Sequence, residues 1–478
     1  MKQLSSYRGR KVVVLGLARS GVAAAKLFHG IGADVVVNDR KERELCPEAD
    51  ELTALGISVV CGGHPEGLVN AETALLVKNP GIPYSAEPVV EAQRLGVEVV
   101  SEVEVAGQLS PAPIIGITGS NGKTTTTTLT GVLLEAAGLN PLVAGNIGRP
   151  LSDAVREVDP NGWLVAELSS FQLKGTTDFR PRIGCLLNVA ETHLDYHGDM
   201  EDYVASKAKL YENQTPSDVA VYNADDETCR KVSEGIKARH VPFSITKRLS
   251  VGVFVEPPYA AIKPGAEGED EAERWIVSRT EDGAEHRVIR VDELGIPGRH
   301  NTANALAAIA IALSAGAKPE QLVPALKNFR GVEHRLEFVG TIQGVKYYND
   351  SKATNPMATT MSILSLPSPL ILIAGGLDRG SDYMELVPVF RDRLKGLVAL
   401  GETREKLGRV AALAGLEAVK LVEPMSDAEG TIRRAVEEAA AMAGPGDLIL
   451  LSPACASWDM FPSYETRGRM FKQSAHTL

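Results

Sequence analysis

Cysteine is scarce in this sequence: there are five among 478 residues, with no Cys-x-x-Cys pair. An odd and widely spaced set argues against a disulfide framework or a zinc site, and it favours reduced thiols in a cytoplasmic protein. Cys455 follows a predicted strand near the C-terminus. Because no Cys/His pattern accompanies it, we interpret it as a small buried thiol rather than a nucleophile.

Long apolar runs and an excess of positive charge are also missing. No run of about 18 apolar residues predicts a membrane span, and the first residues, MKQLSSYRGRK, lack the apolar core of a signal peptide. A net charge of −11 gives no indication of a nucleic-acid partner. With 44% hydrophobic and 23% charged residues the chain is typical of a globular protein, and its length predicts about three domains.

What the sequence does contain is a phosphate-binding pattern, IIGITGSNGKTT at 114–125. An apolar run predicts a buried strand, Gly119 and Gly122 allow a sharp turn, and residues 123–137 are expected to form a helix. Such a turn directs backbone N–H groups and a helix N-terminus toward one point, which suits phosphate. Lys123 is expected to reach the β- and γ-phosphates, and the Thr124 hydroxyl to bind Mg²⁺.

The match to G-x-x-x-x-G-K-[ST] is incomplete, because Ile117 stands where the pattern has its first glycine. The preceding strand, the intact Gly-Lys-Thr and the following helix nevertheless favour an ATP site over an ordinary glycine turn.

The first forty residues predict a β-α-β unit with a glycine turn, GLARSG at 16–21, and an acidic residue, Asp39, about 20 positions further on. Ala18 replaces the middle glycine of the dinucleotide fingerprint. A nicotinamide cofactor is therefore disfavoured, and the pyrophosphate of a UDP group fits the same geometry. The NPGIP turn at 79–83 follows another strand, where it either lines a ligand crevice or is simply rigid.

In the central region, one predicted strand ends before Glu167 and another, over 183–189, is followed by His193. Together they could form a hard-cation site beside the glycine loop, although a lone Glu or His at a strand end is more often a cap or a solvated group. Lys207 lies in a predicted helix at 203–213, and from lysine chemistry alone we expect it at the surface. Asn301 and Asn304 are one helical turn apart, so they either face one ligand or act as caps.

The last third alternates strands with helices and carries anion-binding side chains in NDSKATNP at 349–356. The predicted fold class is α/β with three domains. These are a Rossmann-like domain at 1–101, a central P-loop ATPase-like domain with a mostly parallel sheet at 102–332, and a Rossmann-like domain at 333–478.

Seven segments form a series along nearly the whole chain: TGSNGKTTT (118–126), GNIG (145–148), NVAETHLDYH (188–197), YVASKAKLYEN (203–213), PGRHNTANALAA (297–308), EHRLE (333–337) and NDSKATNP (349–356). In this order they resemble the motifs of the ATP-dependent Mur ligases of peptidoglycan synthesis. Two further segments, ELSSFQL (167–173) and LLSPACASWDMF (450–461), resemble the branch that adds D-glutamate. A DNPR-like motif, expected in the diaminopimelate-adding branch, is absent from the sequence.

The resemblance implies a reaction. ATP would phosphorylate the carboxylate of UDP-N-acetylmuramoyl-L-alanine, and the amine of D-glutamate would attack the acyl phosphate through a tetrahedral intermediate and expel phosphate. Such a site needs charge neutralisation more than a protein nucleophile. The implied cofactors are ATP and Mg²⁺, with two ions expected, and the enzyme would act as a monomer in the cytoplasm without a nucleic-acid or membrane partner.

The resemblance also implies roles for individual residues. The catalytic and metal-binding group comprises Lys123, Thr124, Glu167, His193 and Lys207, of which Lys207 is carbamylated in the family; this reverses its assignment to the surface. The ATP contacts comprise Gly119, Asn121, Gly122, Lys123, Thr124, Thr125, Asn301, Asn304, Arg335 and Asp350. The UDP-substrate contacts comprise Ser20, Asp39, Arg40, Gly81 and Asn146. The D-glutamate contacts comprise Lys352, Thr354, Arg379, Ser457, Trp458 and Tyr464.

Two positions depart from some relatives: Arg379 stands where these have Lys, and Tyr464 where they have Phe. Both keep the charge or the ring. Other classes explain less of the sequence. An NAD-type oxidoreductase leaves the P-loop unexplained, and a nucleotide switch leaves the Glu167/His193 pair unexplained. A Mur ligase that adds another amino acid stays an alternative, whereas a folylpolyglutamate synthetase would begin close to its P-loop.

Overall fold

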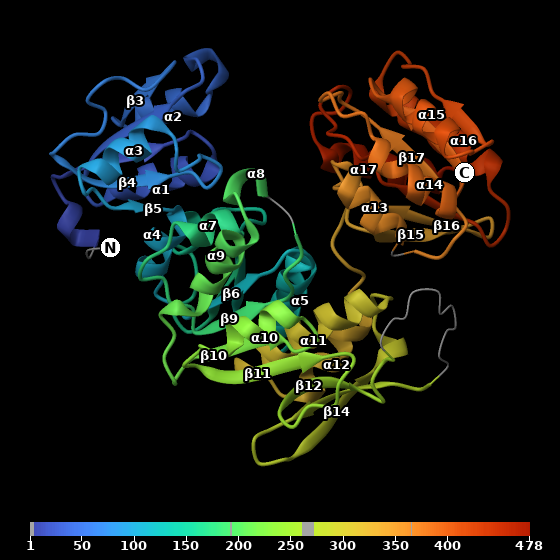
Figure 1. Cartoon of the computed structure of the whole chain (residues 1–478), viewed down its shortest axis with the longest axis horizontal. Coiled ribbons are helices and arrows are strands. Elements are labelled where there is room, and N and C mark those ends of the chain that lie inside the picture. Colours follow the sequence, from blue (N-terminus) through green and yellow to red (C-terminus); the bar gives the residue numbers. More distant parts are fainter. Residues whose placement is uncertain (1–3, 192–193, 261–271, 365) are drawn as a thin grey trace. The chain divides into compact units, whose positions relative to one another are not determined.

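Alternating strands and helices build three sheets in the computed structural model of the chain, which describes residues 4–191, 194–260, 272–364 and 366–478 (Figure 1). Two compact units result, Met1–Phe329 with two of the sheets and Arg330–Leu478 with the third. Because the chain builds three separate sheets, each combined with helices, the predicted α/β fold class with three domains is confirmed. The domain boundaries at 101/102 and 332/333 stay predictions.

The first sheet is parallel throughout, with strand order β3-β2-β1-β4-β5. Its central strand has the buried sequence VVVL at 12–15, because a parallel strand covered on both faces has no solvent side. The elements are η1 (Leu4–Tyr7), β1 (Lys11–Leu15), α1 (Arg19–Gly30), β2 (Asp34–Asp39), η2 (Arg43–Leu45), α2 (Glu48–Ala54), β3 (Ser58–Cys61), β4 (Thr73–Lys78), α3 (Glu87–Arg94), β5 (Val99–Val100) and the connecting α4 (Glu102–Leu109).

The second sheet has the order β14-β13-β12-β11-β10-β9-β6-β8-β7 and is parallel except for the pairs β12–β13 and β13–β14. Its strands are β6 (Ile114–Thr118), β7 (Pro141–Gly145), β8 (Trp163–Glu167), β9 (Ile183–Leu186), β10 (Val219–Asn223), β11 (Arg239–Ser244), β12 (Gly252–Glu256), β13 (Trp275–Arg279) and β14 (Glu285–Arg290). Its helices are α5 (Lys123–Ala136), α6 (Leu151–Ala154), α7 (Ser170–Lys174), α8 (Leu194–His197), α9 (Met200–Glu212), α10 (Glu227–Ser233), η3 (Val291–Glu293), α11 (Arg299–Ser314) and α12 (Pro319–Asn328).

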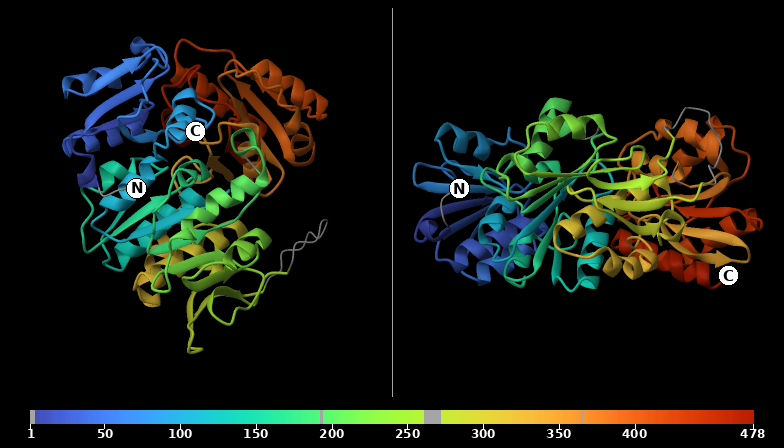
Figure 2. Two further views of the ribbon diagram at one scale, coloured as in Figure 1. Left: turned by 60° about the vertical axis from the view of Figure 1, so that its left-hand side comes forward. Right: turned by 90° about the horizontal axis from the view of Figure 1, so that it is seen from below.

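Strand β6 lies between β8 and β9, with all five of its residues buried. Helices α5 and α11 pack against each other, and α9 packs on β6 and β9 (Figure 2). Gly116 makes room for α9, because a Cβ there would lie 2.7 Å from Leu210 Cδ1. Because β6 pairs in parallel with both β8 and β9, the carboxyl ends of these three strands meet at one edge of the sheet, between the helices that carry the candidate site.

The third sheet has the order β15-β16-β20-β17-β18-β19 and is parallel except for the hairpin β15–β16. The elements are β15 (Glu337–Ile342), β16 (Val345–Asn349), α13 (Pro356–Leu364), β17 (Leu370–Gly375), η4 (Met384–Leu386), α14 (Val387–Arg393), β18 (Leu394–Leu400), α15 (Arg404–Leu413), β19 (Val419–Leu421), α16 (Ala428–Met442), β20 (Leu448–Leu451) and α17 (Tyr464–His476). Apolar residues fill both faces of β17 and β20.

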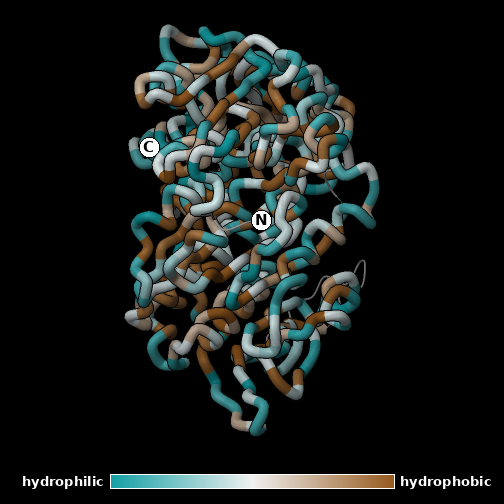
Figure 3. The backbone as a smooth tube through the Cα atoms, turned by 90° about the vertical axis from the view of Figure 1, so that its left-hand side faces the viewer, coloured by the Kyte–Doolittle hydropathy of each residue, from teal (hydrophilic) through white to brown (hydrophobic). Residues whose placement is uncertain are grey.

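One predicted strand was too long. The strand expected over 183–189 ends at Leu186, because the next residues turn toward the glycine loop: Leu187 N–H donates to Thr118 O at 3.0 Å. Hydrophobic and hydrophilic segments alternate along the chain (Figure 3). Among the helices described here, none has the length and apolar character needed to span a membrane.

Candidate active site

The glycine loop runs from the end of β6 to the start of α5 at Lys123, where the helix was expected to begin. Gly122 has φ +81°, and a Cβ on it would collide with Asn304 Oδ1 of α11. A Cβ on Gly119 would come within 2.9 Å of Leu187 Cβ. Both positions therefore require glycine, one for its backbone conformation and both for the close approach of neighbouring segments.

The segment after β9 is hydrogen-bonded along the loop. Asn188 O accepts from Ser120 N–H at 3.0 Å, Asn188 Oδ1 accepts from Asn121 N–H at 2.8 Å, and Asn188 Nδ2 donates to Asn121 O at 3.1 Å. Ala190 N–H also donates to Ser120 Oγ at 2.9 Å, so hydrogen bonds join the loop to residues 188–190. His193 itself lies outside the described residues.

Two lysines converge on one carbonyl of this loop. Lys123 Nζ donates to Gly119 O at 2.8 Å and to Ser120 O at 2.9 Å, and Lys207 Nζ of α9 donates to Gly119 O at 2.9 Å. Only 1% of Lys207 is exposed, and its ammonium lies 4.6 Å from the centroid of the Tyr203 ring. Burial, followed by repulsion from Lys123, lowers the pKa of Lys207 to about 6.

The expectation from lysine chemistry alone, that Lys207 is at the surface, was wrong. Its helix packs over the carboxyl end of the central sheet, and the side chain points into that packing rather than to solvent. A lysine amine with a pKa near 6 is mostly neutral at pH 7 and above, the form in which it is a nucleophile.

Glu167 ends β8 beside the glycine loop, paired in register with Ile117 of β6. Its Oε1 accepts from Asn146 Nδ2 at 3.0 Å, and its backbone O accepts from Asn146 N–H at 2.8 Å. Its Oε2 is buried and has no hydrogen-bond partner among the described residues. A buried carboxylate oxygen without a donor is costly unless a cation meets it, so the donor set here fits a hard metal ion.

The amides of α11 lie at the start of α5. Asn304 Oδ1 accepts from Thr126 Oγ1 and Asn304 Nδ2 donates to Asn301 Oδ1, each at 3.4 Å. Thr124 is buried in the first turn of α5, one residue after Lys123. The structure therefore brings Lys123, Thr124, Glu167, Lys207 and Asn304 to one end of the central sheet.

In the first sheet, the predicted UDP contacts gather at the carboxyl ends of β1, β2 and β4. Asp39 accepts from Leu17 N–H at 2.8 Å and from Lys41 N–H at 2.9 Å, and the Ser20 hydroxyl donates to Asn79 Oδ1. Arg40 and Gly81 are exposed at the same edge.

Lys78, at the end of β4, was missed. Its buried Nζ donates to the backbone oxygens of Asn79 (3.3 Å), Pro80 (3.2 Å) and Ile82 (2.8 Å), and lies 3.1 Å from Tyr196 Oη of α8. It thereby fixes the NPGIP turn. Burial lowers the pKa of Lys78 to about 7.

In the second unit, two cations lie over aromatic rings at the predicted D-glutamate positions. Lys352 Nζ is 5.8 Å from the Tyr464 ring centroid, and the Arg379 guanidinium is 5.1 Å from that of the exposed Trp458. Ser457 is buried nearby in sequence, and Thr354 is exposed.

Asp350 is buried, and its carboxylate accepts from Leu336 N–H at 3.2 Å and from Ser452 Oγ at 2.8 Å. Burial raises the pKa of Asp350 to about 6. These bonds tie the loop after β16 to the turn before β15 and to the loop after β20.

Arg467 of α17 was also missed by the sequence analysis. It donates from Nε to Ser351 Oγ at 3.0 Å, and from Nη2 to Ser351 O at 2.9 Å and Cys455 O at 3.1 Å. Cys455 is a buried thiol as interpreted, and burial raises its pKa. No local pattern marked Arg467, since Ser351, which accepts two of its hydrogen bonds, lies 116 positions away in the sequence.

Family models match three stretches of the chain: the Mur ligase MurD-like N-terminal domain at 10–101, the Mur ligase middle domain at 117–312, and the Mur ligase glutamate ligase domain at 334–455. Two curated relatives, from Geobacillus sp. (strain WCH70) and Geobacillus kaustophilus (strain HTA426), are each 46% identical over 100% of both chains. Both carry the name UDP-N-acetylmuramoylalanine–D-glutamate ligase.

Solved structures share the fold at lower identity. The UDP-N-acetylmuramate-alanine ligase of Thermotoga maritima matches with a TM-score of 0.56 and 19% identity, over 98% of this chain and 99% of that one. The MurF ligase of Thermotoga maritima, in complex with ADP, matches with a TM-score of 0.55 and 15% identity over 100% of both.

Proposed function

The chain belongs to the Mur ligase family, and we propose that it is an ATP-dependent ligase that joins D-glutamate to UDP-N-acetylmuramoyl-L-alanine in peptidoglycan synthesis. Identity of 46% over the full length to relatives named for that reaction supports the choice of amino acid. The ELSSFQL and LLSPACASWDMF segments, which resemble the D-glutamate-adding branch, support the same choice.

One observation carries the proposal: Lys123 and Lys207 meet at the Gly119 carbonyl, at the same sheet edge as Glu167, whose Oε2 has no hydrogen-bond partner in the described part of the chain. In the reaction, a substrate carboxylate oxygen bonds to the γ-phosphorus of ATP and the bond to the ADP oxygen breaks. The D-glutamate amine then bonds to the acyl carbon, loses a proton, and phosphate leaves. Negative charge accumulates on phosphoryl oxygens, so a cationic and pre-organised loop is the main requirement.

Lys123 serves this chemistry as a point charge whose position the loop carbonyls fix. The loop glycines let the backbone N–H groups approach the phosphates, and the α5 N-terminus adds its partial positive charge. Asn121 and Thr125 complete the phosphate cradle. Asn301, Asn304, Arg335 and Asp350 supply the remaining ATP contacts in this proposal.

The residues present fit a divalent cation. Thr124 would hold one Mg²⁺ at the phosphates, and Glu167, His193 and a carbamylated Lys207 would hold a second. Bound Mg²⁺ neutralises phosphate charge. The amine of Lys207, neutral at pH 7 because of its burial, is suited to react with CO₂: nitrogen bonds to carbon and one proton is released, which gives an oxygen ligand.

The other ligands have separate places in the proposal. The UDP-substrate binds at Ser20, Asp39, Arg40, Gly81 and Asn146, and D-glutamate at Lys352, Thr354, Arg379, Ser457, Trp458 and Tyr464. We assign the three domains to 1–101, 102–332 and 333–478. Since ATP and UDP-linked precursors are cytoplasmic metabolites, we propose that the enzyme acts in the cytoplasm, as a monomer.

The test is phosphate release from ATP, Mg²⁺ and UDP-N-acetylmuramoyl-L-alanine, with D-glutamate, L-lysine or diaminopimelate supplied in turn. The proposal expects release with D-glutamate alone, and none from Lys123→Ala. Release with another amino acid would keep the family and refute the substrate. Absence of release with every amino acid would refute the proposed reaction.

A further inference from the structure

A strained turn of the second unit carries Arg335. His334 has φ +65° and Leu336 has φ +44°, so two non-glycine residues in the left-handed region flank this arginine. Such conformations cost free energy and persist only where the surrounding structure holds them, and they are frequent at ligand sites. The contacts that hold the backbone of this turn therefore indicate which function the turn serves.

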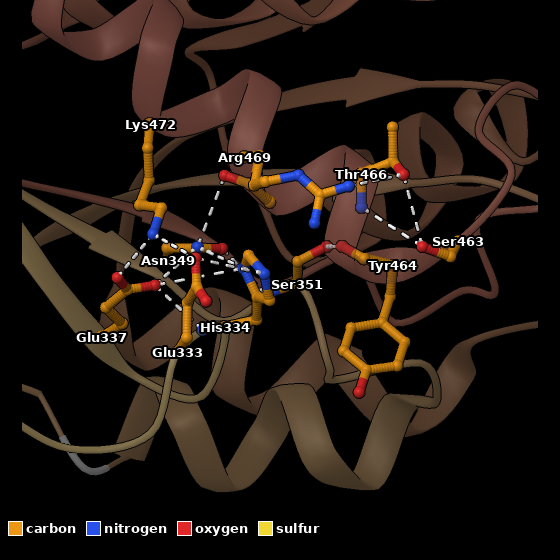
Figure 4. A network of polar contacts seen from close by, with 11 residues as sticks. Glu333, His334, Glu337, Asn349, Ser351, Ser463, Tyr464, Thr466, Arg469 and Lys472 are labelled. Atoms are coloured by element: carbon orange, nitrogen blue, oxygen red, sulfur yellow. Dashed lines mark hydrogen bonds and ion pairs between the residues drawn. The ribbon is translucent and has the colours of Figure 1, made fainter. Parts of the chain in front are cut away.

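Hydrogen bonds with Glu337, Asp350 and Lys352 hold the backbone of this turn, and Asn349 in turn holds the Glu337 carboxylate. Figure 4 shows His334, Glu337 and Asn349 of this set. Glu337 Oε2 accepts from His334 N–H at 2.9 Å, and Asp350 Oδ1 accepts from Leu336 N–H at 3.2 Å. Lys352 N–H donates to His334 O at 3.0 Å, and Asn349 Nδ2 donates to Glu337 Oε2 at 2.9 Å. Three backbone groups of the turn thus have partners in β15 or the loop after β16, and Arg335 N–H donates to Val332 O at 3.0 Å.

Helix α17 supports these groups from behind. Lys472 Nζ donates to Glu333 Oε1 at 2.7 Å and to Glu337 Oε1 at 2.8 Å, so one ammonium joins both ends of the turn. The His334 ring is buried against Gly468, where a Cβ would collide with it. Glu333, His334 and Glu337 could be mistaken for a metal site, but the Lys472 ammonium already supplies the cation between the two carboxylates.

The Arg335 side chain differs from its neighbours. It is half-buried, and within the described part of the chain its guanidinium donates no hydrogen bond to another residue. A planar group with five N–H donors suits phosphate oxygens. Many hydrogen bonds thus hold the backbone around Arg335, whereas its guanidinium interacts with the Asp350 carboxylate only through its charge.

We infer that Lys472, acting through Glu333 and Glu337, is a positioning residue that fixes Arg335 for the phosphates of ATP. This rests on the proposed function, in which Arg335 is an ATP contact. Lys472 touches no substrate in this scheme. Its ion pairs hold the strained turn in the one conformation that presents the guanidinium.

The test compares Lys472→Met with Lys472→Arg and with a matched control, Lys395→Met. Lys395 forms an ion pair with Asp447 in the same unit, away from the turn. We expect Lys472→Met to raise the KM for ATP roughly tenfold, since small misplacements of a positioned group have effects of this order or more. The KM for D-glutamate is expected to stay unchanged, Lys472→Arg to restore the KM for ATP, and Lys395→Met to behave as the wild type.

Two further measurements separate positioning from general damage. In an Arg335→Ala background, Lys472→Met is expected to cause no additional loss, because it acts through the guanidinium; equal losses in both backgrounds would overturn the inference. If Lys472→Met does not fold, Glu337→Gln replaces it. Affinity for a non-hydrolysable ATP analogue, measured by calorimetry, needs no amino acid, so it tests the inference even where the D-glutamate reaction fails. An unchanged affinity in the variant would refute it.

Discussion

Replacing Gly122 by alanine should damage the site in two separable ways. An alanine held in the left-handed conformation at φ +81° lowers the free energy of unfolding by about 1–2 kcal/mol. Alanine also reduces the conformational freedom of the unfolded chain, which offsets roughly 0.4–1 kcal/mol of that loss. The new Cβ also collides with Asn304 Oδ1, and losing the hydrogen bonds of that amide adds about 1 kcal/mol. We expect a net destabilisation of about 2 kcal/mol and at least a roughly tenfold weaker binding of ATP.

The matched control is Gly138→Ala, just beyond the other end of α5. Gly138 has φ +73°, but a Cβ there would meet nothing within 4 Å. It should therefore cost only the backbone term, about 1 kcal/mol, with ATP affinity unchanged. Urea unfolding followed by tryptophan fluorescence measures the first quantity, since Trp163 and Trp275 lie in the central sheet. Calorimetry measures the second. Equal stability and equal ATP affinity of the two variants would refute the close-approach argument.

Three further predictions concern buried titratable groups. Burial raises the pKa of Glu102 from 4.5 to about 7, so the folded state binds a proton more tightly than the unfolded state, and the free energy of unfolding falls as pH rises through this window. Glu102→Gln should therefore be more stable than the wild type by roughly 2–3 kcal/mol at pH 8 and nearly equal to it at pH 5. A difference in urea unfolding that stays constant between these pH values would contradict this. Buried Glu104 accepts hydrogen bonds from the N–H groups of residues 177–179 at 2.9–3.1 Å. Glu104→Gln should therefore lower the free energy of unfolding by about 2 kcal/mol in the same urea assay. An unchanged unfolding midpoint would show that these hydrogen bonds contribute little. Removing CO₂ should lower ligase activity, and bicarbonate should restore it. This gain in activity with bicarbonate should decrease as pH falls through about 6, because Lys207 becomes protonated there. Activity that is insensitive to CO₂ would exclude a required carbamate.

The sequence predicted the parts of the site that depend on local pattern. Apolar runs gave the positions of the strands. The loop glycines, Lys123 and Glu167 lie at or just after strand ends, and the carboxyl ends of parallel strands meet at one edge of a sheet, so the sequence predicted polar groups at that edge. The end of β9 was misjudged, since a contact with the glycine loop stops that strand at Leu186, three residues before the predicted end at 189.

Residues that act through distant partners were not predictable in this way. Lys472 and Glu337 are 135 positions apart, and Arg467 and Ser351 are 116 apart. Nothing in the local pattern distinguishes these cations from solvated ones. The burial of Lys207 followed from the family resemblance and not from its own chemistry. His193 lies outside the described residues, so its role stays a prediction.

The central claim is that the substrate carboxylate takes the γ-phosphoryl group of ATP before D-glutamate attacks. The most direct measurement uses UDP-N-acetylmuramoyl-L-alanine with ¹⁸O in its carboxylate and analyses the released phosphate by mass spectrometry. An acyl-phosphate route transfers one labelled oxygen to each phosphate formed with D-glutamate. Unlabelled phosphate would mean that water, and not the substrate, attacks ATP, and it would contradict the account.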